Sequence, residues 1–194
     1  MTIINPDAVA VISVMGPHAG ESVDQVFTRK QREIEDTGKS FWIYKSVTAR
    51  PDKACVRVND IVRNGFTPIC VFIEPSTVTG ARATTGASAA KEFSTDRDCW
   101  QHIPKGIKAT GRMSAYAMVF DEFDLGFTST PMFVDLWDYS ILANPGRAIK
   151  FILGQSTTCC ENISSRDDLG KMKSHTRRIV AVARMADPFA VWVR

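Results

Sequence analysis

The chain has 194 residues, of which 44% are hydrophobic and 23% are charged, and its formal net charge is +3. This length and composition predict one globular domain with a buried core, and the mild charge permits an anionic ligand without requiring a nucleic acid. No apolar run approaches the about 20 residues of a membrane span and no basic leader is present, so we expect a cytoplasmic protein without membrane contact.

The first 74 residues alternate between strand and helix patterns. Continuous apolar runs at 8–15 and 68–73 are typical of strands covered on both faces, and the aromatic, β-branched run at 41–44 also predicts a strand. Helices are predicted between them, over 22–38 and 51–65. The order β-α-β-α-β predicts a parallel sheet with right-handed crossovers.

Both predicted helices carry end signals. Ser22 and Gln25 have the spacing of a capping box, and Gly38 supplies a stop. Pro51 suits the first turn of the second helix, and Gly65 lies just past its end. The side chains predicted to pack on the sheet are Val23, Val26, Phe27 and Ile34 in the first helix and Ala54, Cys55, Val58, Ile61 and Val62 in the second.

Residues 76–112 are rich in Gly, Ala, Ser and Thr and have no sustained periodicity. A segment of this kind is typical of a functional loop or a lid, and we expect 80–92 to be its most mobile part because small side chains bury little apolar area. Within 82–112 basic residues alternate with Phe93, Trp100 and His102, a mixture that also occurs in nucleic-acid-binding loops. A solvated loop whose Trp100 packs into the core is the simpler interpretation.

The remaining residues have a β-like pattern. Strands are predicted at 113–120, 131–137 and 148–153, with a short helix beginning at Ser164 or Ser165. We expect 178–185 and 189–194 to form a terminal hairpin, in preference to one helix broken at Pro188. The whole chain, 1–194, is therefore predicted to be a single α/β domain: an N-terminal parallel β-α-β-α-β unit extended by a mixed, partly antiparallel β-rich C-terminal half.

Polar residues follow each of the first three predicted strands. Ligands of open α/β sheets bind outside the carboxyl ends of the strands, so we expect His18, Lys45 and Glu74 to line one pocket. The candidates for holding a phosphate are Gly16, Gly20, Ser22, Lys45, Ser46, Arg50 and Thr77. The candidates for acid–base catalysis are His18, Glu21 and Glu74.

The loop at 16–22 does not match a standard nucleotide motif. Gly16 and Gly20 are one residue too close for a Walker loop, Glu21 stands where that motif has lysine, and the Rossmann fingerprint needs a third glycine. Glu21 would also repel a phosphate at the helix N-terminus. A simple turn leading into a capped helix remains the alternative to a binding loop.

Metal and cysteine chemistry have weaker support. Asp121, Glu122 and Asp124 could hold magnesium, but such clusters are more often solvated strand ends, and we predict no metal site. His102 and His175 have no partner at metal-ligand spacing. The five cysteines are odd in number and scattered, which favours reduced thiols.

Three functions are compatible with these patterns. The leading hypothesis is the binding or processing of a small phosphate-bearing, nucleotide-like molecule at the strand ends, with no cofactor specified. The alternatives are a nucleic-acid-binding accessory protein that uses the basic loop 82–112, and a non-catalytic protein-interaction or assembly domain. In the last case the apolar C-terminal half supplies the subunit interface of a homo-oligomer.

Overall fold

A computed structural model describes residues 4–16, 20–46, 51–75, 114–142, 144–148, 157–163 and 176–192. Its two α-helices are α1 (Val23–Thr37) and α2 (Pro51–Arg63), and its short 3-10 turns include η1 (Pro6–Ala8), η4 (Gly126–Thr128) and η5 (Leu136–Asp138). The strands are β1 (Val9–Val14), β2 (Ser40–Ser46), β3 (Ile69–Ile73), β4 (Ser114–Asp124), β5 (Phe133–Asp135), β6 (Tyr139–Ile141), β7 (Asn144–Ala148), β8 (Thr157–Asn162) and β9 (Thr176–Trp192).

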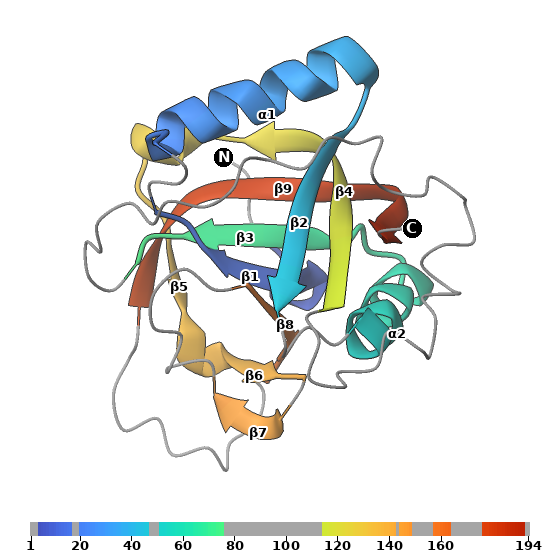
Figure 1. Ribbon diagram of the computed structural model, residues 1–194. Coiled ribbons are helices and arrows are strands. Elements are labelled where there is room, and N and C mark those ends of the chain that lie inside the picture. Colours follow the sequence, from blue (N-terminus) through green and yellow to red (C-terminus); the bar gives the residue numbers. More distant parts are fainter. Residues whose placement is uncertain are drawn as a thin grey trace.

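The described strands join into one mixed sheet with the order β2-β4-β9-β3-β1-β8-β6-β7, and β5 pairs with β9 beside this path (Figure 1). β1 and β3 are parallel, and the other pairings are antiparallel. The predicted α/β class and the partly antiparallel character of the sheet are therefore confirmed. In the part of the chain described, no helix is long and apolar enough to cross a membrane.

The position of β2 differs from the expectation. The predicted β-α-β-α-β unit places β2 beside the other two strands and parallel to them, but β2 pairs antiparallel with β4, from Ser40 opposite Phe120 to Ser46 opposite Ser114. Because β4, β9 and β3 are successively antiparallel, β2 runs opposite to β1 and β3. The sequence identifies β2 as a strand, but its hydrogen-bonding partner β4 lies about seventy residues further along the chain and is not encoded locally.

The C-terminal segment is one long strand, so the predicted hairpin is wrong. Both halves of β9 run in the same direction against β4, with Trp192 opposite Tyr116 and Met185 opposite Phe120. In the pairing of β9 with β4, Ala190 and Met185 are successive paired residues of β9, and the residues between them, which include Pro188, form a bulge. Proline is tolerated there because a bulge requires no ladder hydrogen bond.

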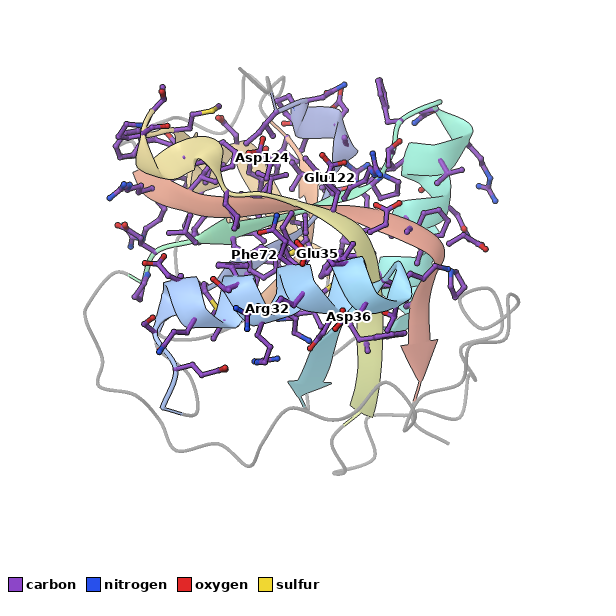
Figure 2. All side chains as sticks on the ribbon, turned by 90° about the horizontal axis from the view of Figure 1, so that it is seen from above. Arg32, Glu35, Asp36, Phe72, Glu122 and Asp124 are labelled. Carbon is purple, nitrogen blue, oxygen red and sulfur yellow. The ribbon has the colours of Figure 1, made fainter. Side chains whose placement is uncertain are left out.

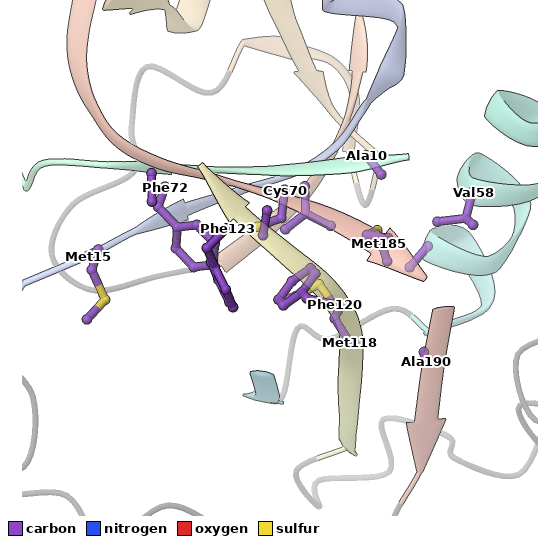
Figure 3. Packing of buried hydrophobic residues seen from close by; sticks show 14 of the residues in the cluster. Ala10, Met15, Val58, Cys70, Phe72, Met118, Phe120, Phe123, Met185 and Ala190 are labelled. Atoms are coloured by element: carbon purple, nitrogen blue, oxygen red, sulfur yellow. The ribbon is translucent and has the colours of Figure 1, made fainter. Parts of the chain in front are cut away.

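The core lies on both faces of the sheet. Phe72 of β3 is completely buried, and the rings of Phe27, Trp42, Phe120 and Phe123 lie around it at centroid distances of 4.6–6.2 Å. Figure 3 shows Phe72 beside Phe120 and Phe123. This cluster includes side chains from both helices, so α1 and α2 cover the same face. The opposite face is closed by the irregular segments after β4, with Phe127, Leu136 and Tyr139.

The helix ends confirm the predicted local signals. Ser22 Oγ accepts a hydrogen bond from the Gln25 N–H, the Ser22 N–H donates to Gln25 Oε1, and Gly38 has a φ of 79° at the C-cap. In α2, Ala54, Val58 and Ile61 are buried as predicted, but Val62 is 43% exposed and does not belong to the core face. The segment 76–112, the predicted strand at 148–153 and the predicted helix after Ser164 lie outside the described residues, apart from Ala148 at the end of β7.

Candidate functional site

The carboxyl ends of β1 and β3 lie side by side. Val14 is paired with Ile73, and the Met15 N–H donates to the Ile73 carbonyl at 2.8 Å. Gly16 is buried immediately after this pair, and Glu74 follows β3. This edge is where two parallel strands end together, and it is the position at which open α/β sheets bind their ligands.

The N-terminus of α1 follows β1 after a short connection. Gly20 has a φ of 83°, a conformation that strongly favours glycine, and an added Cβ there would contact nothing within 4 Å. Ser22 caps the helix, so its Oγ and its N–H are both engaged with Gln25. Helix geometry leaves the N–H groups of Val23 and Asp24 without intrahelical acceptors, and together with the helix dipole these groups favour an anion.

Glu21 is engaged in an ion pair. Its carboxylate accepts two hydrogen bonds from Arg29, at 2.9 Å from Nε and 2.8 Å from Nη2. The hydrogen bond to Glu21 is the largest contribution to the raised pKa of Arg29. The charge of Glu21 at the helix start is thus compensated, so the repulsion of a phosphate is weaker than the sequence suggests. Its role as an acid–base group stays a prediction.

Arg29 also takes part in a second group of contacts, centred on Glu33. It donates to Glu33 at 3.2 Å, and Glu33 accepts from Lys30 Nζ at 2.8 Å and from Ser40 Oγ at 2.7 Å. Lys30 is only 7% exposed and also donates to the carbonyl of Phe41. Burial lowers the pKa of Lys30 despite the opposing effect of Glu33. These contacts fasten α1 to the start of β2.

Arg178 is the residue of this edge that the sequence analysis missed. It lies at the start of β9, its carbonyl accepts from the Glu74 N–H at 3.0 Å, and its Nη1 donates to Glu74 Oε1 at 3.3 Å. Its Nε is buried and has no hydrogen-bond partner among the described residues. Glu74 follows Phe72 by two residues, which places it on the face that α1 covers. No local signal marks Arg178, because its position depends on the pairing of β9 with β3.

Lys45 and Ser46 end β2 at a different place in the sheet. Ser46 pairs with Ser114 at the beginning of β4, and this part of β4 pairs with the last residues of β9. Glu74, by contrast, is bonded to Arg178 near the beginning of β9. The expectation that the carboxyl end of β2 meets those of β1 and β3 is therefore wrong, because β2 runs in the opposite direction. The side chains of Lys45 and Ser46, and all of His18, Arg50 and Thr77, lie outside the described residues.

The acidic residues of β4 contact Arg184 of β9 and the turn that follows β4. Arg184 donates to Asp121 at 2.7 Å and forms an ion pair with Glu122 at 2.8 Å, and Asp124 accepts from the Gly126 N–H. In the described ranges, no group of three histidine, cysteine or acidic side chains could hold a metal ion. The thiols of Cys70 and Cys160 are buried and are not in disulfides.

Comparisons of this chain with protein-family models, with curated proteins and with solved structures found no significant match.

Proposed function

We propose that this protein binds a small phosphate-bearing, nucleotide-like molecule at the carboxyl ends of β1 and β3. The observation that carries the proposal is Arg178, a cation beside these strand ends whose buried Nε has no hydrogen-bond partner among the described residues. A guanidinium is suited to a phosphate because it can donate two parallel hydrogen bonds.

Two further features support an anionic ligand at this edge. The first turn of α1 begins shortly after β1 and offers backbone N–H groups at the positive end of the helix dipole. Arg29 compensates the nearby carboxylate of Glu21 with two hydrogen bonds. Glu74 holds Arg178 through one contact at 3.3 Å, which leaves the guanidinium able to turn towards a ligand.

The test is a thermal-shift and calorimetric screen of nucleotides, sugar phosphates, inorganic phosphate and single-stranded DNA. We expect a nucleotide or sugar phosphate to stabilise the protein, and Arg178→Ala to weaken that ligand about 5- to 150-fold through loss of a charge-assisted hydrogen bond of about 1–3 kcal/mol. Arg63→Ala is the matched control, because Arg63 is an exposed arginine paired with Asp60 on α2. The Arg63→Ala variant should bind the ligand with the affinity of the unchanged protein.

Two outcomes would contradict the proposal. Equal affinity of the Arg178→Ala and Arg63→Ala variants would remove Arg178 from the site. Binding of single-stranded DNA alone, with affinity falling steeply as salt rises, would favour the nucleic-acid hypothesis and its basic loop at 82–112.

A protein-interaction domain is the second candidate, and one observation favours it. Val56, Val62 and Phe66 are 57%, 43% and 38% exposed, and all three belong to α2 or to the turn that ends it. Exposed apolar side chains that share one helix are typical of interaction surfaces, whereas single ones are common on any protein.

A further inference from the structure

Phe133 is the most exposed large apolar side chain among the described residues. It lies in the short strand β5 and is 61% exposed, although burial of an aromatic ring is favourable. Met132 and Val134, its neighbours along the chain, pack against the core on the other face. The ring therefore points away from that core, because successive side chains of a strand alternate between faces.

The register of β5 places this ring beside Arg178. Phe133 is paired with Arg178 in the antiparallel ladder of β5 and β9, and directly opposed side chains lie on the same face. The Ile179 N–H donates to the Met132 carbonyl at 2.9 Å. Phe133 and Arg178 are therefore the adjacent non-hydrogen-bonded pair, the kind in which opposed side chains come closest. Since Arg178 is bonded to Glu74 on its other side, the three side chains form a row across the sheet.

The surroundings of the ring differ from those of a protein-interaction patch, in which exposed apolar side chains are contiguous. In the part of the chain described, the other exposed large apolar side chains belong to α2 or to the turn that ends it. α2 lies on the opposite side of the molecule from β5 in Figure 1. The cross-strand neighbour of Phe133 is instead Arg178, whose side chain is 37% exposed. A single exposed ring beside an accessible cation suits a flat aromatic ligand that carries a negative charge.

We propose that Phe133 is the base-stacking residue of the site at Arg178, so that the ligand is a free nucleotide whose base lies on the ring and whose phosphate meets the guanidinium. This assignment rests on the proposed function, in which Arg178 holds the phosphate. Aromatic side chains bind bases by stacking, and proteins that bind nucleic-acid strands stack successive bases on several rings. Within the described ranges no second exposed ring lies in β5 or beside Arg178, which favours a single nucleotide.

The test is isothermal titration calorimetry with the common ribonucleoside monophosphates and with ribose 5-phosphate, which has the phosphate but no base. At least one nucleotide should bind the unchanged protein about 5- to 150-fold more tightly than ribose 5-phosphate, because stacking of the base adds to the phosphate contact. Phe133→Leu should remove this difference and leave the affinity for ribose 5-phosphate unchanged. Phe66→Leu is the matched control, because Phe66 is an exposed phenylalanine at the end of α2, and this variant should bind every ligand normally.

Two further variants separate the contribution of the ring from that of the cation. Phe133→Trp should keep the preference for the nucleotide over ribose 5-phosphate, because an indole ring also stacks on a base. Arg178→Ala should weaken the nucleotide and ribose 5-phosphate alike, because both carry the phosphate.

The outcomes distinguish the role of Phe133 from the proposed function. Equal affinities for nucleotides and ribose 5-phosphate, or equal losses in Phe133→Leu and Phe66→Leu, would overturn the role of Phe133 and leave the anion site at Arg178 in place. No binding of any of these phosphates, or full affinity of Arg178→Ala, would overturn the proposed function and the stacking assignment with it. Tighter binding of a short single-stranded oligonucleotide than of its mononucleotides, lost steeply as salt rises, would overturn the assignment to a free nucleotide.

Discussion

The two helices pack on the same face of the sheet but differ in the side chains that they bury and expose. α1 presents Arg32, Glu35 and Asp36 to solvent (Figure 2), and its inner side combines apolar residues with the ion pairs of Arg29 and Lys30. α2 buries three small or branched apolar side chains and leaves two others, Val56 and Val62, exposed to solvent. Its Arg57 donates to the carbonyls of Asp7 and Val9.

The two helices therefore differ in what they leave exposed to solvent. The outer side of α1 is charged, as expected for a helix that faces only water. The outer side of α2 keeps apolar area in contact with solvent, which a partner would cover. We therefore expect substitutions around α1 to change stability, and substitutions on the outer side of α2 to change association.

The largest expected effect is in the core beneath α1. Phe27 is 2% exposed and its ring contacts those of Trp42, Phe72 and Phe123, so Phe27→Ala should lower the free energy of unfolding by about 3–5 kcal/mol. Ile61→Ala in α2 should cost less, about 2–3 kcal/mol, because the side chain that it removes is smaller. Urea denaturation of both variants measures the difference. Equal losses would show that the two helices contribute alike to the core.

An intermediate effect is expected from the polar contacts of α1. Burial raises the pKa of Glu33, but hydrogen bonds from Lys30 and Ser40 and the charges of Lys30 and Arg29 outweigh it, so the pKa is held below its usual value of 4.5. Stability from this carboxylate is therefore fully present above pH 4.5 and is lost as the pH falls through the lower, folded-state pKa. Glu33→Gln should destabilise the protein by about 1–2 kcal/mol at neutral pH and by less in acid.

Urea denaturation at a series of pH values from neutral to acid measures this dependence. Glu35→Gln is the control, because Glu35 is an exposed glutamate of the same helix. If the loss of stability in Glu33→Gln were the same at every pH, the carboxylate would not be the stabilising group.

The smallest effect on stability is expected on the outer side of α2. Val56→Ser and Val62→Ser remove exposed methyl groups and should change the free energy of unfolding by no more than about 0.5 kcal/mol. If this surface binds another protein, retention of that partner should fall while the denaturation midpoint stays constant. A loss above about 1 kcal/mol would instead show that these valines belong to the core.

The sequence predicted the local features of the site and missed its long-range ones. The capping box of Ser22 and Gln25 and the stop at Gly38 were confirmed, because they depend on contacts within three or four residues. The ion pair of Glu21 with Arg29 spans eight residues across the helix start, outside the usual helical spacing. The contact of Glu74 with Arg178 joins residues about a hundred positions apart, so only the folded sheet could reveal it.

The sequence by itself determined the two helices with their ends and the strands β1 to β4, but it did not reveal β6, β7 or β8. The elements that it did determine follow from side-chain periodicity and from capping groups, which act over a few residues. The tertiary structure alone decided that β2 pairs with β4, that β9 is one strand instead of a hairpin, and that the end of β2 lies away from the ends of β1 and β3. The physical reason is that strands bond to one another through backbone groups that every residue carries. Which strands become neighbours therefore depends on how the whole chain buries its apolar faces.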